Sequence, residues 1–285
     1  MCYHKSIKII KNFANNKNLV YNKYKGENKM IALVTGASSG IGRDMARYLN
    51  SLDYDLIITS RDSNKLEELK RELNAKNDRI VDIIVKDLAK TEECISLYNE
   101  IKEKYEFIDV VINNAGFGLC GRFCDTNLEK ELSMIDTNIK AVHILTKLFL
   151  KDMVEKDKGR ILNVSSIAGF MPGPLMATYY STKNYVLRLT QAIKEELNKS
   201  NSNVKISVLC PGPVNTNFNN VANVKFALKG LSSEYVAKYA IDKMLKNKSV
   251  IVVGWKIKLA RFLSKISPDT IVAKVCYYMQ RRKIK

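Results

Sequence analysis

The chain has 285 residues, 46% of them hydrophobic and 27% charged, which is enough for one large α/β domain or two small ones. Its net charge of +18 is concentrated at the ends: residues 1–29 hold seven lysines and one acid, and residues 246–285 hold eleven basic residues and one acid. The 216 residues between them carry only about +2, which argues against a nucleic-acid-binding body.

The cysteines show no spacing typical of a metal site, and neither histidine lies near them. We therefore expect no metal ion, and reduced thiols as in a cytoplasmic protein. No apolar run reaches the roughly 18 residues of a membrane span, and the N-terminus lacks the pattern of a secretory signal. The six cysteines are Cys2, Cys94, Cys120, Cys124, Cys210 and Cys276.

The first 29 residues are rich in Lys and Asn and contain one short apolar stretch, Ile7 to Ile10. We expect residues 1–29 to be a disordered basic extension, with a targeting role as the alternative. Met30 immediately precedes a strand-like run, so a dinucleotide-binding and catalytic domain is predicted at 30–254. Residues 255–285 then form a basic amphipathic tail.

From Met30 onward, short apolar runs alternate with amphipathic segments at helical spacing. Runs rich in Val, Ile and Leu are typical of strands buried on both faces, so they predict a parallel sheet between two layers of helices. Seven strands in this rhythm predict one doubly wound α/β domain, a Rossmann fold. The predicted strands are 31–35, 55–60, 80–85, 108–113, 160–165, 204–210 and 249–253; the predicted helices lie near 41–52, 63–75, 91–104, 127–156, 178–199 and 232–247.

A glycine-rich turn, Thr35 to Gly42, follows the first predicted strand and opens the first helix. This turn predicts nucleotide binding, because glycines let the backbone approach a pyrophosphate and the free N–H groups of the helix start bind its oxygens. Gly42 would allow tight packing of the helix on the sheet. The expected cofactor contacts of the turn are Gly36, Ser38, Ser39, Gly40, Ile41 and Gly42.

Tyr179 and Lys183 are four residues apart on a predicted helix and therefore share one face. A phenol has an ordinary pKa near 10, and a neighbouring ammonium is expected to lower it toward the working pH. Tyr179 is thus the candidate acid/base. Tyr180 is the competing candidate, but no lysine follows it at the same spacing.

Taken in order, these motifs resemble those of the short-chain dehydrogenase/reductase family over roughly residues 31–253. The resemblance implies hydride transfer between a nicotinamide cofactor and a carbonyl or alcohol. It implies that Ser166, thirteen residues before Tyr179, binds the substrate oxygen, with Ser165 as the alternative. It also implies that Asn138 holds a water in a proton relay from Lys183.

The same resemblance assigns the remaining cofactor contacts. Ser60 stands where family members that use NAD carry Asp, and Arg61 follows it, so we expect NADP (NADPH) despite the acidic Asp62. Asn113 is expected to brace neighbouring strands as readily as to touch the cofactor. The other expected contacts are Asp87, Leu88, Asn114, Ala115, Gly116, Tyr179, Lys183, Pro211, Gly212, Val214 and Thr216.

The segments 117–123, 167–175 and 214–231 are mostly apolar and are expected to surround the substrate. They favour a hydrophobic carbonyl, such as a 3-oxoacyl thioester or a bulky ketone, over a sugar. For the tail at 255–285 three roles stay open: a helix packed on the body, peripheral membrane contact, or a lid over the substrate.

Family resemblance favours a homodimer or homotetramer built on the helices near 127–156 and 178–199. Two rival functions remain. One is a protein that binds or senses NADP(H) without catalysis, which the complete catalytic set disfavours. The other is a nucleic-acid binder, which the near-neutral body disfavours.

Overall fold

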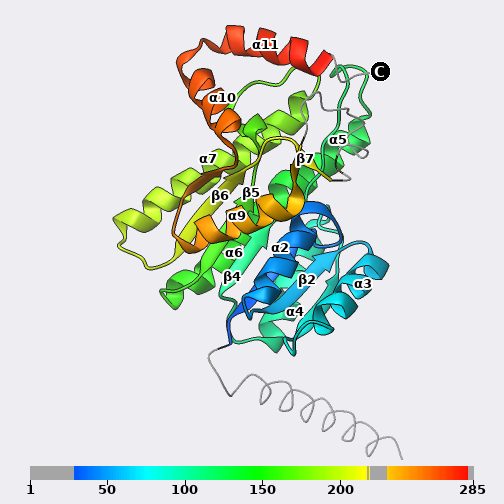
Figure 1. Cartoon of the computed structure of the whole chain (residues 1–285), viewed down its shortest axis with the longest axis vertical. Helices are drawn as coiled ribbons and strands as arrows, with labels where there is room; N and C mark the ends of the chain where they lie inside the picture. The colour runs from blue at the N-terminus through cyan, green and yellow to red at the C-terminus, as the bar shows by residue number, and fades with distance from the viewer. Residues whose placement is uncertain (1–28, 217, 219–229, 282–285) are drawn as a thin grey trace, which may run out of the picture.

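The computed structural model describes residues 29–216, 218 and 230–281. The described residues form an α/β fold whose main sheet has seven parallel strands (Figure 1). Its strands are β1 (Ile31–Thr35), β2 (Asp55–Ser60), β3 (Val81–Val85), β4 (Val110–Asn113), β5 (Arg160–Val164), β6 (Lys205–Cys210) and β9 (Val250–Val252).

The strand order is β3-β2-β1-β4-β5-β6-β9, and every neighbouring pair is parallel. The order reverses direction between β1 and β4, and this switch point opens a crevice at the carboxyl ends of the strands. A separate parallel pair, β7 (Val214–Asn215) and β8 (Leu231–Ser232), lies beyond β6 in the chain. The doubly wound fold expected from the sequence is confirmed.

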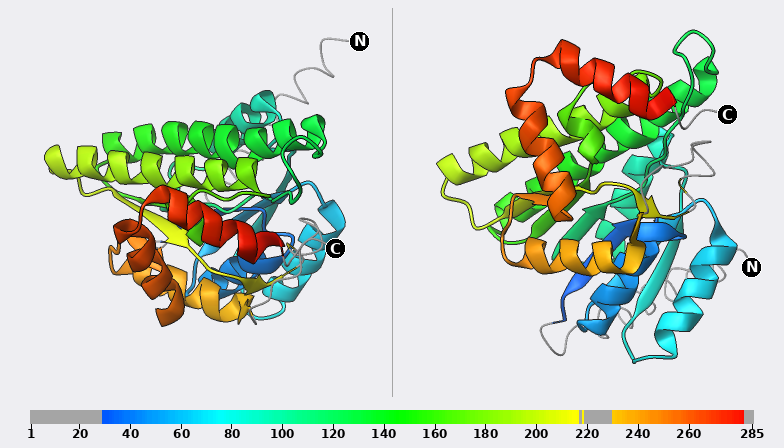
Figure 2. Two further views of the ribbon diagram at one scale, coloured as in Figure 1. Left: turned by 90° about the horizontal axis from the view of Figure 1, so that it is seen from above. Right: turned by 45° about the horizontal axis from the view of Figure 1, so that its top comes forward.

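Helices cover both faces of the sheet (Figure 2). One apolar core lies between the sheet and α2, α3 and α9, and a second lies between the sheet and α4, α6 and α7. Both cores are built from the Val, Ile and Leu runs that predicted buried strands. The helices are α2 (Gly40–Ser51), α3 (Ser63–Asn74), α4 (Thr91–Lys104), α5 (Leu128–Ile135), α6 (Val142–Glu155), α7 (Ala177–Lys199) and α9 (Ser233–Leu245).

The prediction of a single helix near 127–156 is wrong in one respect, because the structure has two α-helices there, separated by a different kind of turn. A π-helical turn, η1 (Asp136–Ala141), separates α5 from α6. Asn138 lies in this turn and is fully buried, and its side chain bonds both backbone polar groups of Phe117. The wider turn therefore places a polar side chain inside the fold, as π turns often do at functional sites.

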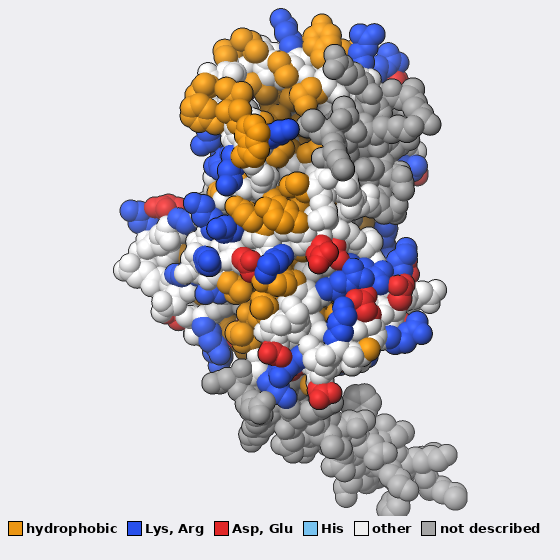
Figure 3. All heavy atoms as spheres, viewed as in Figure 1, with side chains coloured by type: hydrophobic (Ala, Val, Ile, Leu, Met, Phe, Trp, Pro, Cys, Tyr) orange, Lys and Arg blue, Asp and Glu red, His pale blue; other side chains and the backbone are white. Residues whose placement is uncertain are grey.

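The tail at 255–285 begins as two helices, α10 (Trp255–Ile266) and α11 (Asp269–Arg281). They lie beside the carboxyl edge of the sheet, and many of their apolar side chains remain exposed (Figure 3). No helix among the described residues is long and apolar enough to cross a bilayer. The extension predicted at 1–29 lies outside the described residues except for Lys29, as does most of the predicted substrate segment at 214–231.

Candidate active site

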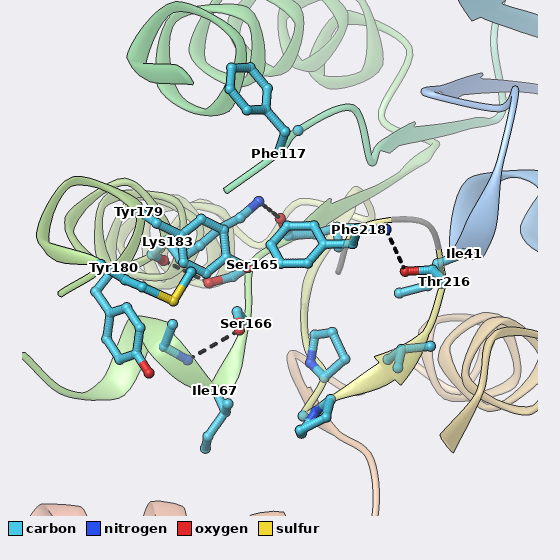
Figure 4. Close-up of a pocket in the computed structure, with 18 of the residues that line it drawn as sticks. Ile41, Phe117, Ser165, Ser166, Ile167, Tyr179, Tyr180, Lys183, Thr216 and Phe218 are labelled. Carbon is cyan, nitrogen blue, oxygen red and sulfur yellow. Dashed lines mark hydrogen bonds between the residues drawn. The ribbon is translucent and has the colours of Figure 1, made fainter. Parts of the chain in front are cut away.

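A cavity of about 1060 Å³ runs along the carboxyl ends of the strands, from the glycine-rich turn to α10 and α11. Almost every residue predicted to bind the cofactor lines it; of those predicted for cofactor or catalysis, Gly42 and Asn138 do not. The cavity thus brings together predicted site residues that are up to 180 positions apart in the chain, from Gly36 to Thr216. Figure 4 shows the part around the catalytic candidates.

The glycine-rich turn has the geometry that its sequence predicts. Gly36 and Gly40 have φ angles of +66° and +56°, which glycine adopts without strain. A Cβ at Gly42 would lie 2.4 Å from the carbonyl oxygen of Gly36, so this position requires close packing. Ser39 precedes α2 without making a side-chain capping bond to any described residue. The turn therefore presents helix N–H groups to the cavity that could bind phosphate oxygens.

At the end of the cavity predicted to hold the adenosine, Arg61 is 67% exposed and its Nη1 lies 4.0 Å from Oδ1 of Asp87. Asp62 caps α3: its carboxylate accepts a hydrogen bond from the Lys65 N–H at 3.1 Å and pairs with Lys65 Nζ at 2.8 Å. These contacts with Lys65 hold the pKa of Asp62 below its usual range. The carboxylate next to Arg61 is therefore bound to the start of α3.

The two asparagines at the end of β4, Asn113 within it and Asn114 just after it, both make structural hydrogen bonds. Asn113 is buried and donates hydrogen bonds to Asn163 Oδ1 at 2.8 Å and Thr146 Oγ1 at 3.1 Å. Asn114 also lines the cavity, but its side-chain amide donates to the carbonyls of Thr35 and Gly36. The bond to Gly36 fixes the glycine-rich turn against β4.

Tyr179 and Lys183 lie on the same face of α7, as predicted, and both line the cavity. Lys183 Nζ lies 5.9 Å from the centre of the Tyr179 ring and donates a 3.0 Å hydrogen bond to the carbonyl of Val164. Ser166, two residues after β5, also lines the cavity; its Oγ accepts a 3.2 Å hydrogen bond from the N–H of Ala168, and its interaction with Tyr179 lowers the pKa of that phenol. The three side chains predicted for catalysis therefore meet at one wall of the cavity (Figure 4).

Burial dominates the electrostatics of this wall. It raises the pKa of Tyr179 to about 12, and the hydrogen bond with Ser166 offsets only part of this. Burial also lowers the pKa of Lys183 to about 8. The expectation that a nearby ammonium lowers the pKa of Tyr179 is therefore wrong in net direction, because removing the phenolate from water costs more than its neighbours restore.

The two competing candidates have other partners. Ser165 donates a 2.6 Å hydrogen bond to the backbone carbonyl of Lys183, which ties β5 to α7. Tyr180 accepts a hydrogen bond from the side-chain amide of Gln280, and burial raises its pKa. Figure 4 shows the Tyr180 ring turned away from Lys183. The geometry thus favours Ser166 over Ser165 and Tyr179 over Tyr180.

Asn138 lies behind this wall. Its side chain contacts Phe117 through two bonds, of 3.0 and 2.9 Å, and donates to Thr182 Oγ1 at 3.0 Å. A Cβ added at Gly116 would lie 2.7 Å from Asn138 Oδ1 and 3.3 Å from Lys183 Nζ. Glycine at 116 therefore leaves a small space between the asparagine and the ammonium.

The segment after β6 lines the end of the cavity predicted to hold the nicotinamide. Pro211, Gly212, Val214 and Thr216 line it, as predicted. The Thr216 hydroxyl accepts a 3.2 Å hydrogen bond from the N–H of Phe218. The Phe218 ring lies 5.5 Å from the Tyr179 ring, centre to centre, so this segment reaches the catalytic wall.

The sequence did not assign α10 and α11 to the cavity, although a lid was one of the open alternatives. Both helices line it on one side, and the buried residues of α11 recur every four positions, as the inner face of a helix requires. The lining residues of α10 and α11 include Ile257, Ala260, Leu263, Ser264, Ile271, Val272, Cys276 and Gln280.

Comparison with known proteins agrees with this geometry. The model of the short chain dehydrogenase family matches residues 30–226. The ketoacyl reductase HetN of Nostoc sp. is 31% identical over 236 residues, which cover 82% of this chain and 81% of that protein.

Solved structures share the fold. A short-chain dehydrogenase from Sphingobium yanoikuyae in complex with NADPH has a TM-score of 0.74 at 25% identity, over 84% of this chain and 96% of that chain. A short-chain dehydrogenase/reductase from Burkholderia phymatum in complex with NAD has a TM-score of 0.76 at 22% identity, over 82% and 92%. With the family match over residues 30–226 and the strand order above, the chain belongs to the short-chain dehydrogenase family of oxidoreductases.

Proposed function

We propose that the chain is an NADP(H)-dependent oxidoreductase that interconverts a carbonyl and an alcohol on a hydrophobic substrate. One observation carries the proposal: Tyr179, Ser166 and Lys183 meet at one wall of a cavity that continues to the phosphate-binding turn. A nicotinamide cofactor supplies the hydride in reduction, and the cavity offers backbone N–H groups for its pyrophosphate.

The proton for the substrate oxygen comes from Tyr179. With a pKa of about 12 the phenol keeps its proton on Oη at neutral pH, as a proton donor for carbonyl reduction must. Ser166 donates a hydrogen bond to the substrate oxygen as negative charge develops there. Lys183, with a pKa of about 8, is cationic at neutral pH and stabilises the phenolate that remains.

The space between Asn138 and Lys183 supports a proton relay. Glycine at 116 keeps this space open, and Oδ1 of Asn138 and Nζ of Lys183 border it. In reduction, Lys183 would pass a proton to the Tyr179 phenolate, and a water in this space would then return a proton from solvent to the Lys183 amine. Asn138 is the positioning residue of this path, because its bonds to Phe117 and Thr182 fix it.

NADP is favoured over NAD by the adenosine end of the cavity. Arg61 and Lys65 line it, and a guanidinium and an ammonium both bind a 2′-phosphate well. Asp62, which would repel that phosphate, is bound to the start of α3. The Sphingobium relative, solved with NADPH, lends support at 25% identity.

A hydrophobic carbonyl fits the other end of the cavity. Its wall includes Phe117, Met171, Met176 and Phe218, and the inner faces of α10 and α11 add further apolar side chains. The ketoacyl reductase among the relatives makes a 3-oxoacyl thioester a reasonable first candidate, beside bulky ketones. The test is a panel of such carbonyls and of sugars, followed at the NADPH absorbance band and repeated with NADH.

The rival is a protein that binds NADP(H) without catalysis. Fluorescence titration with NADPH tests binding independently of turnover. Tight NADPH binding with no oxidation by any member of the carbonyl panel would favour the rival over the enzyme.

We also propose a homodimer or homotetramer with its subunit contact on the helices of residues 127–156 and 178–199, of which α6 and α7 are the longest. These two helices lie side by side as an outer layer (Figure 2). Nδ1 of His143 and the hydroxyl of Tyr185 lie 2.7 Å apart on their exposed side. Analytical ultracentrifugation of the whole chain measures the subunit number, and a monomer at all concentrations contradicts the contact.

A further inference from the structure

Helix α10 has two faces of opposite character, arranged contrary to those of an ordinary surface helix. Its inner face, which meets the body, carries Ile257, Ala260 and Ser264, and these line the cavity. Arg261 lies on the same side, 4.7 Å from the centre of the Phe170 ring. Leu263 also lines the cavity, so the residues of the inner face are small or polar apart from Ile257 and Leu263.

The outer face of α10 carries the large apolar side chains. It consists of Trp255, Leu259, Phe262 and Ile266, which fall within about one quarter of the helix circumference at 3.6 residues per turn. Trp255 is 69% exposed, Phe262 59% and Ile266 65%, and none of the four lines the cavity. Burying them on the body would need the helix to turn over.

Helix α11 also carries exposed apolar side chains. Its buried residues, Val272, Cys276 and Gln280, face the cavity, while Tyr278 is 63% exposed. We use the name outer apolar face for the exposed large apolar side chains of the two helices that do not line the cavity: Trp255, Leu259, Phe262, Ile266, Tyr277 and Tyr278. Figure 3 shows hydrophobic side chains gathered over these helices, with Lys and Arg around them. A monomer seldom leaves so many large apolar side chains exposed together without a partner.

The charge around the outer apolar face is almost entirely positive. Residues 255–281 contain six basic residues and one acid, Asp269, and three further basic residues follow at 282–285. Lys258, Lys265 and Lys274 are exposed, and no described carboxylate forms a salt bridge with them. Basic residues beside an exposed apolar stripe with Trp and Phe are typical of helices that lie in a membrane interface.

We propose that the outer apolar face of α10 and α11 docks on an anionic membrane surface. The apolar side chains enter the boundary between headgroups and acyl chains, and the lysines bind the anionic headgroups. A second copy of the chain is the less suitable partner. A two-fold contact would bring the same basic residues of both copies together, and like charges in contact oppose association.

Docking in this way has a consequence for the substrate, and this consequence rests on the proposed function. The helices that carry the outer apolar face also line the cavity with their inner faces. A hydrophobic carbonyl dissolved in the bilayer would therefore meet the cavity at the membrane surface. The docking itself is independent of catalysis and can be measured without substrate.

The experiment is sedimentation of the full chain with phosphatidylcholine vesicles, with and without phosphatidylglycerol. The first variant is Trp255→Gln, Phe262→Gln and Ile266→Gln together, and the second is Lys258→Gln, Lys265→Gln and Lys274→Gln together. The matched control replaces three partly exposed apolar residues elsewhere: Val85→Gln, Ile95→Gln and Tyr235→Gln. Circular dichroism melting and NADPH titration show that each variant is folded.

We expect binding to the anionic vesicles that weakens with added salt. The lysine variant should bind roughly fivefold more weakly for each charge removed, and the apolar variant about tenfold or more overall. The control variant should bind like the original chain. Loss of vesicle binding in a variant that still binds NADPH separates this proposal from the proposed enzyme activity.

Three results would overturn the proposal. One is the absence of binding to anionic vesicles, and another is equal binding to both kinds of vesicle. The third is an apolar variant that binds as well as the original chain. Ultracentrifugation adds a check: a dimer that becomes a monomer in the apolar variant, together with no vesicle binding, assigns the outer apolar face to a second copy.

Discussion

Lys183 Nζ lies 5.9 Å from the centre of the Tyr179 ring, and burial favours the neutral form of both groups. It raises the pKa of Tyr179 and lowers the pKa of Lys183. With a pKa of about 12, Tyr179 keeps its proton throughout the neutral range, whereas Lys183, with a pKa of about 8, loses its proton above about pH 8. In reduction, therefore, the proton donor is present throughout the neutral range. The cation that stabilises the resulting phenolate is the group that titrates.

This relationship predicts the pH dependence of carbonyl reduction. The pKa of Lys183 is lowered, so the lysine is charged below about pH 8 and neutral above it. The rate should be level on the acidic side of pH 8 and should fall up to about tenfold per pH unit above it. The measurement is kcat/KM for the best carbonyl from pH 6 to about 10, and a level profile to pH 10 contradicts the assignment of Lys183.

Tyr179→Phe removes the proton donor and keeps the ring that packs against Phe218. We expect kcat to fall by about a hundredfold to ten-thousandfold, the usual contribution of a general acid. The dissociation constant for NADPH and the melting temperature should change little. Tyr180→Phe is the matched control, because it removes a hydroxyl of the same chemistry on the neighbouring residue, and it should keep most of the activity.

Arg61→Ala tests the cofactor preference. Because Arg61 is largely exposed and its nearest described acid is 4.0 Å away, its removal should leave the fold unchanged. Loss of a charged contact with the 2′-phosphate should raise the KM for NADPH by about tenfold to a hundredfold. The KM for NADH should stay within a factor of about two. Equal increases in KM for NADPH and NADH would contradict the proposed contact between Arg61 and the 2′-phosphate.

Gln280→Leu tests the part that α11 plays in substrate binding. Gln280 is 2% exposed, lines the cavity and donates to Tyr180, while its Oε1 has no hydrogen-bond partner among the described residues. Leucine has a similar volume. The substitution removes one hydrogen bond, which lowers the free energy of unfolding, and one unpaired buried oxygen, which raises it. Each effect is about 1 kcal/mol, so the two oppose one another.

We therefore expect the free energy of unfolding of Gln280→Leu to change by no more than about 1 kcal/mol. The KM should rise for carbonyls that carry a hydroxyl or amide N–H able to bond Oε1, and should stay constant for purely apolar ones. Chemical denaturation and kinetics with the two kinds of carbonyl measure both quantities. An equal change in KM for both would show that Gln280 does not recognise the substrate.

The seven strands of the main sheet could be predicted to within about two residues, because continuous runs of Val, Ile and Leu are typical of strands buried on both faces. The short strands β7 and β8 were not predicted. The π turn at Asp136–Ala141 could not be predicted. It depends on Asn138 bonding Phe117, which precedes it by 21 positions in the chain. No local pattern contains that contact.

Within the site, the spacing of Tyr179 and Lys183 was enough to place them on one helix face. The pKa of Tyr179 could not be predicted in direction, because it depends on burial by segments that come together only in the fold. The two faces of α10 explain why its role stayed open: apolar residues occur at many helical positions, so the sequence does not show which side meets the body. Only the arrangement over the cavity shows it.

The order of these parts along the chain has a practical consequence. All the residues assigned to hydride and proton transfer precede position 217, whereas the two helices that cover the cavity follow position 254. The covering helices can therefore be exchanged as a unit by joining another sequence after Gly254. Such chimaeras would change the substrate specificity and the cellular location of the protein, while the residues that carry out the reaction stay the same.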